Sequence, residues 1–139
     1  MMLVKRLLKN DEGAAVIELA IALPVLVTMI YGIFECSQLY EANAGMQHAL
    51  GEGARYATLC IPNTSNVTTG CDLPTDANIK AREQAKLFGP YGGNFTVADV
   101  VDGTNLKTLT ITYTRTMNFL LVPGPTITLS RSKQVYTVT

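Results

Sequence analysis

The sequence predicts an α+β protein in which a long amino-terminal helix spans a membrane and continues into a small extracytoplasmic domain. Ala14 to Phe34 is a mostly apolar run of 21 residues, and about 20 such residues cross a hydrocarbon core of roughly 30 Å. Farther along, Thr108 to Met117 alternates apolar residues with threonine, which is typical of a strand with one buried face. A second helix and a roughly three-stranded antiparallel sheet would complete the domain.

Length and composition restrict the possible functions. The 139 residues leave room for one membrane segment and one small core. The 11 basic residues balance 11 acidic ones and do not cluster after residue 50, so we expect no nucleic-acid partner. The single histidine, His48, has no nearby acid or cysteine pair, and the sequence contains no phosphate-binding glycine loop or nucleophile-elbow serine. We therefore expect neither an enzyme nor a cofactor or metal site.

The charges beside the apolar run predict its orientation. Lys5, Arg6 and Lys9 precede the run, and no basic residue follows it until Arg55. Because basic residues near a membrane segment stay on the cytoplasmic side, the amino terminus is expected in the cytoplasm. This predicts a single-pass protein with residues 1–13 cytoplasmic, 14–34 in the membrane and 35–139 outside the cytoplasm.

Glu18 is the one charged residue within the apolar run. A charged side chain at a bilayer centre costs on the order of 2.5 to 3.5 kcal/mol, so such a residue suggests a function. One explanation is that a positive charge from a neighbouring chain pairs with Glu18. The other is that Glu18 lies near the cytoplasmic interface of an ordinary anchor and extends into the headgroups.

The helix is expected to continue from Ala14 to about Thr58. Pro24 removes one backbone donor, which should kink or loosen the helix locally. Three glycines, at 45, 51 and 53, each cost roughly 1 kcal/mol relative to alanine, so close packing is expected there. The predicted packing face outside the membrane contains Cys36, Leu39, Asn43, Met46, Leu50, Gly53 and Ala57.

Two cysteines flank a polar, turn-forming loop. Cys60 and Cys71 enclose ten residues, and a disulfide between them would contribute roughly 2 to 3 kcal/mol in an oxidising compartment. The alternative is two unpaired thiols. For Cys36 the sequence leaves three states open: lipid-modified, disulfide-bonded or free.

A second helix is expected from Ala77 to Phe88, capped by Thr75 or Asp76 and ended by Gly89-Pro90. Its modest apolar side would contain Ile79, Ala81, Ala85, Leu87 and Phe88. Its solvated side would contain Lys80, Arg82, Glu83 and Lys86.

The remaining residues favour strands. We expect strands over Phe95–Val101, Thr108–Met117 and Ile127–Val138, with a turn at Asp102-Gly103. The apolar connection Asn118–Thr126 would place Phe119 to Val122 in the core, or alternatively in a patch that docks on a partner or the membrane. A change in inward parity predicts a bulge or bend between Ser130 and Lys133.

The amino-terminal region resembles prepilins. In that class a short basic leader ends in glycine and is cut on the cytoplasmic face, and glutamate is the fifth residue of the mature helix. The resemblance implies that a prepilin peptidase cleaves between Gly13 and Ala14. It also implies that the freed amine of one subunit pairs with Glu18 of another.

Two segments resemble the TadE-like family of pseudopilins from tight-adherence, Flp-type pilus systems. They are GAAVIELAIALPVLVTMIYGIFE from residue 13 and GEGARYATL at residues 51–59. One position departs from the pilins of these systems, which usually carry Tyr or Phe where this chain has Leu19. The residues that occupy the family's motif positions are Gly13, Glu18, Pro24, Gly32, Glu35, Glu52, Gly53, Ala54, Arg55 and Tyr56.

This resemblance implies a pilin-like domain and a role as a minor pilin or pseudopilin that helps initiate or assemble a tight-adherence type IV pilus, supporting surface adhesion or biofilm formation. The implied partners are the prepilin peptidase, other pilin or pseudopilin subunits and the assembly platform, in a hetero-oligomer at the bacterial inner membrane. The alternative is an uncleaved, single-pass envelope protein whose outer domain binds a partner.

Overall fold

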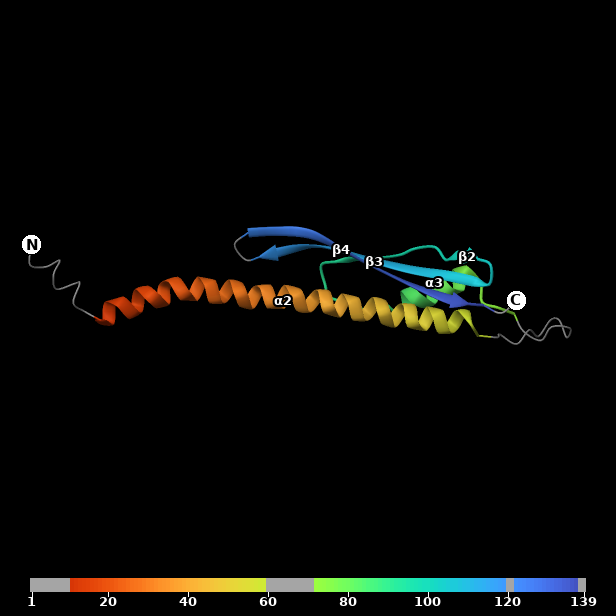
Figure 1. Ribbon diagram of the computed structural model, residues 1–139, viewed down its shortest axis with the longest axis horizontal. Coiled ribbons are helices and arrows are strands. Elements are labelled where there is room, and N and C mark those ends of the chain that lie inside the picture. Colours follow the sequence, from red (N-terminus) through yellow and green to blue (C-terminus); the bar gives the residue numbers. More distant parts are fainter. Residues whose placement is uncertain (1–10, 60–71, 120–121, 138–139) are drawn as a thin grey trace, which may run out of the picture.

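The computed structural model describes residues 11–59, 72–119 and 122–137. Its elements are α2 (Asp11–Ala57), α3 (Asp76–Lys86), β1 (Asn94–Val97), β2 (Val101–Gly103), β3 (Leu106–Phe119) and β4 (Val122–Tyr136). Figure 1 shows the sheet and α3 beside the carboxyl-terminal part of α2, while the amino-terminal part of α2 projects beyond them. This arrangement confirms the predicted fold class.

Some predictions concern residues outside those that the structure describes. Cys60 and Cys71 both lie there, so their disulfide stays a prediction. Leu120 and Leu121 of the predicted apolar connection lie there as well.

α2 is one helix of 47 residues that continues through Pro24, and the loosening expected at this proline stays a prediction. From Glu35 onward one side of α2 is buried, with Ala42, Met46 and Ala49 at 0% exposure. The predicted packing face begins at Cys36, one residue too late. In the structure Glu35 is buried and Cys36 is exposed. The steps of three and four residues are otherwise those expected for a helix packed on a sheet.

β3 is the central strand of an antiparallel sheet. β4 pairs along one edge of β3, while β1 and β2 lie end to end along the other edge. The strand predicted over Phe95–Val101 is therefore interrupted at residues 98–100. The turn after β2 is at Thr104 and Asn105, not at Asp102-Gly103, and Asn105 has φ 58°, a left-handed conformation that asparagine tolerates.

The hairpin of β3 and β4 is longer than predicted. Asn118 and Thr126, assigned to a connection, are paired in the strands, and the register shift lies between Thr116 and Asn118. The bulge predicted between Ser130 and Lys133 is wrong because pairing is regular there. Tyr136 is 78% exposed, so the strand needs no change of parity to place it.

The core lies between the sheet and α2. Leu109, Ile111 and Tyr113, alternate residues of β3, are at most 1% exposed and face the helices, whereas the intervening threonines lie on the other face. The Tyr113 ring packs on Phe95 of β1, with ring centroids 4.6 Å apart. The predicted alternation of this strand is confirmed.

α3 packs against α2 through a side that is partly different from the one predicted. Thr75 caps α3 by accepting a hydrogen bond from the Asn78 amide at 3.4 Å. Glu83, assigned to the solvated side, is 0% exposed, whereas Ala81 and Ala85 of the predicted apolar side are exposed. Gly53 of α2 explains the error, because a glycine leaves room for the Glu83 side chain between the helices.

Candidate assembly surface

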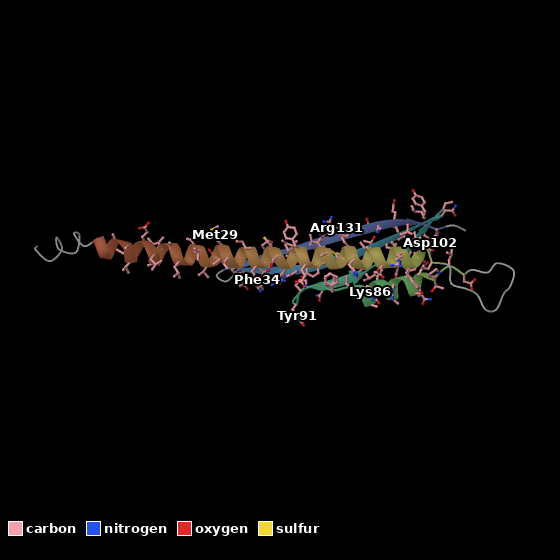
Figure 2. All side chains as sticks on the ribbon, turned by 90° about the horizontal axis from the view of Figure 1, so that it is seen from below. Met29, Phe34, Lys86, Tyr91, Asp102 and Arg131 are labelled. Carbon is pink, nitrogen blue, oxygen red and sulfur yellow. The ribbon has the colours of Figure 1, made fainter. Side chains whose placement is uncertain are left out.

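The amino-terminal part of α2, residues 13–34, is here called the apolar half. An 18-residue window within α2 is long and apolar enough to cross a membrane, and none of that window is buried. Figure 2 shows side chains that project from this half, including Met29 and Phe34, which are 65% and 55% exposed. The apolar half is therefore a candidate membrane span and a candidate surface for packing against other helices.

Glu18 is exposed on the apolar half. A shallow groove of about 440 Å³ runs beside it and is otherwise lined by Ile21, Ala22, Val25, Leu26 and Met29. Within residues 11–59, 72–119 and 122–137, Glu18 forms no ion pair. Ala14 lies four residues earlier, hence on the same side of the helix, and Gly13 and Ala14 are exposed too. The groove thus offers an apolar helix a place to pack, with one carboxylate at its edge.

The motif glycine and glutamate at the end of the apolar half hold the β3–β4 hairpin. Gly32 faces Phe119, whose Cε1 atom lies 4.0 Å from the position that a Cβ on Gly32 would occupy. Glu35 is 2% exposed and pairs with Arg115 of β3, whose Nη2 lies 3.2 Å from Oε2 and donates a hydrogen bond of 3.4 Å to Oε1. Arg115 also donates to Gln38. These contacts join the apolar half to the folded domain.

The family motif in the sequence points to Glu35, whereas Arg115 was not predicted as its partner. The signal was present, because Arg115 follows Leu109, Ile111 and Tyr113 in the inward-facing series of the strand. A charged residue at an inward position needs a partner, and Glu35 is the buried acid that α2 supplies.

The second motif block, residues 52–56, forms the contact between α2 and α3. Glu52 pairs with Arg82 at 3.4 Å, and Gly53 and Ala54 are buried. Tyr56 packs against the core, while Arg55 is exposed. This block therefore positions α3 within the domain.

The exposed Cys36 has a free thiol. It lines an open pocket of about 250 Å³ with Leu39, Tyr40, Asn43, Leu129 and Arg131.

His48 makes structural contacts with the segment around the end of α3. Its Nδ1 is 3.3 Å from the Lys86 carbonyl oxygen, and its ring packs on Phe88. In the part of the chain that the structure describes, no three His, Cys, Asp or Glu residues gather as metal ligands.

The motif residues just described, from Gly13 to Arg55, lie on one continuous helix. Residues 13–55 match the family of TadE-like proteins. The predicted resemblance is thereby confirmed over most of α2, including Glu18, Gly32 and Glu35, and Tyr56 lies one residue beyond the match. The TadE-like match associates the chain with Tad, or Flp-type, pilus systems in general.

The TadE-like match spans less than a third of the chain and stops before α3 and the sheet. Neither the curated proteins nor the solved structures contain a significant match to this chain.

Proposed function

We propose that this protein is a minor pilin or pseudopilin that helps initiate or assemble a tight-adherence type IV pilus, and so supports surface adhesion or biofilm formation. The prepilin peptidase, other pilin or pseudopilin subunits and the inner-membrane assembly platform would be its partners. The outer domain would lie in the periplasm or outside the cell.

Glu18 is the observation that carries this proposal. It is an exposed carboxylate beside an apolar groove, on a helix with a TadE-like sequence. Packing a second apolar helix into this groove would remove Glu18 from solvent, which is tolerable only if a positive charge accompanies the second helix. The amine released by cleavage before Ala14 on a neighbouring subunit supplies such a charge.

Substituting Glu18 tests the proposal. In cells that assemble the pilus, Glu18→Ala should abolish filaments, or the incorporation of this subunit into them, while the protein still reaches the membrane. Immunoblots of sheared filaments and of membranes measure both quantities. Glu41→Ala is the matched control, because Glu41 is an exposed acid on the same helix but outside the apolar half. Normal assembly with Glu18→Ala would refute the pairing role.

The mature amino terminus provides a second readout. Mass spectrometry of the membrane fraction should find a chain that begins at Ala14 where the peptidase is active. If only full-length chain is found and Glu18→Ala assembles normally, the protein is better described as an uncleaved envelope protein with a partner-binding outer domain.

A further inference from the structure

The end of the β3–β4 hairpin exposes apolar residues, beside the uncharged Asn118, that the proposed function does not use. Its described residues Phe119, Pro123, Gly124 and Pro125 are here called the hairpin tip. Phe119 is 37% exposed, and both prolines are exposed. The sequence from Thr116 to Ser130 contains no charged residue, so the whole end of the hairpin is uncharged.

The hairpin tip lies beside an equally uncharged part of α2. Between Glu18 and Glu35 the helix has no charge, and Phe119 contacts it at Gly32. Figure 1 shows that the hairpin points away from α3 and toward the amino-terminal part of α2, most of which extends beyond it. The first charged groups on both elements meet at one level, in the Glu35–Arg115 pair.

A second contact that involves a charged residue lies farther from the apolar half. Arg131 of β4 donates a hydrogen bond of 2.7 Å to Asn43, farther from the apolar half. Figure 2 shows Arg131 on the domain side of both Met29 and Phe34. The boundary between uncharged and charged side chains is therefore shared by α2 and the hairpin.

We propose that the hairpin tip enters the outer leaflet of the lipid bilayer beside α2. The proposal rests on the membrane assignment of α2 but not on pilus assembly. Lipid is the favoured occupant because the tip adjoins Gly32, which lies in the segment 14–34 that the sequence predicts to be in the membrane.

The backbone of the hairpin tip suits a lipid environment. In hydrocarbon an unpaired backbone N–H is costly, which normally excludes a sheet edge. Pro123 and Pro125 have no N–H, and Phe119 and Asn118 pair across the hairpin with residues of β4. At Pro123 and Pro125 the tip therefore exposes apolar area with no backbone donor to leave unpaired.

A single tryptophan can report the depth of the tip, because the chain contains no native tryptophan. The full chain with Phe119→Trp would be reconstituted into phosphatidylcholine vesicles whose acyl chains are brominated either near the headgroup or near the chain end. We expect blue-shifted emission that loses most of its intensity with shallow bromine and less with deep bromine. Pro125→Trp is a second reporter on the exposed side, should the first variant fold poorly.

Two reference variants show the quenching expected for a tryptophan deep in the bilayer and for one in water. Leu23→Trp, in the middle of the apolar half, should be quenched most by deep bromine, and Tyr91→Trp, at a residue that is 99% exposed, should be quenched by neither. Unquenched, water-like emission from both tip reporters would overturn the proposal. Blue-shifted emission that bromine does not quench would also overturn it, since the tip would then be packed against protein. Neither outcome bears on Glu18 and filament assembly.

Discussion

Glu83 is the residue whose environment differs most from the one its sequence position suggested. Its side chain is 0% exposed between α3 and α2, and within the described residues neither carboxyl oxygen has a hydrogen-bond partner. Burial raises the pKa of Glu83 from 4.5 to about 7. The folded protein therefore keeps this carboxyl protonated at pH values where the unfolded chain has lost the proton.

This raised pKa predicts a stability that falls as pH rises. Below pH 4.5 both states are protonated, and between 4.5 and about 7 only the folded state keeps the proton. Unfolding therefore becomes easier across that window, by about 3 kcal/mol in total, and levels off above it. Glu83→Gln should remove this pH dependence and make the protein more stable than the parent near pH 7.

Urea denaturation of the full chain in detergent micelles, followed by circular dichroism across the window, measures the effect of Glu83→Gln. The control is Glu41→Gln, at an exposed position, which should follow the parent at every pH. Parallel curves for Glu83→Gln and the parent would show that Glu83 titrates normally.

At the scale of elements, α2 approaches its neighbours closely at two glycines. A Cβ at Gly45 would lie 1.8 Å from the Phe88 carbonyl oxygen, and one at Gly53 would lie 2.4 Å from the Glu83 Cγ atom. A Cβ at Gly51 would meet nothing within 4 Å. The predicted close packing is thus confirmed at Gly45 and Gly53 and absent at Gly51.

Alanine substitutions at these glycines should have opposite effects. Gly45→Ala forces backbone atoms apart and should destabilise the domain by about 1 to 3 kcal/mol. Gly51→Ala, the matched control on the same helix, should stabilise it by about 0.5 to 1 kcal/mol through helix propensity alone. Thermal unfolding of the full-length variants compares them, and equal shifts in the same direction would contradict the packing at Gly45.

An element can be predicted from the sequence when its structure depends on its own residues, and not when it depends on contacts with other elements. The extent of α2 and the alternation of β3 depend on local periodicity, so the sequence predicts both. Glu83 and Arg115 depend on what another element places opposite them, namely Gly53 and Glu35. The interruption of the predicted strand at residues 98–100, between β1 and β2, likewise depends on how both strands pair with β3. The leader cleavage and the role of Glu18 involve other molecules and stay predictions.

At the scale of the whole molecule, a buried ion pair just past the apolar half joins α2 to the sheet. Arg115 and Glu35 have side chains only 11% and 3% exposed, and Gln38 adds a further contact to the arginine. A buried pair of this kind costs desolvation energy, so its clearest role is to fix the geometry of the elements that it connects. Here we expect it to fix how the sheet sits on α2.

Removing one partner should therefore cost more than removing both. Arg115→Met leaves the Glu35 carboxylate buried and unpaired, which should destabilise the domain by about 3 to 5 kcal/mol. The double variant Glu35→Gln/Arg115→Met should recover part of this loss. Arg131→Met is the control, since among the described residues it removes one hydrogen bond, to Asn43, and should cost about 1 kcal/mol.

Denaturant unfolding of the parent, Glu35→Gln, Arg115→Met and the double variant, all full-length, gives the four free energies from which the coupling energy of the pair follows. Limited proteolysis adds a structural readout, because cleavage in the hairpin should accelerate in Arg115→Met and not in Arg131→Met. Additive effects of the two substitutions would mean that Glu35 and Arg115 act independently.

Because α2 is unbroken from the apolar half into the folded domain, the direction in which Glu18 points is fixed relative to that domain. Inserting a single residue between Gly32 and Glu18 would turn one relative to the other by about 100° and lengthen the helix by about 1.5 Å. Inserting a whole heptad would return the original facing to within about 20°. If Glu18 pairs as proposed, changes in helix length are constrained by angle as well as by membrane thickness, and insertions of complete helical turns would be tolerated better than single residues.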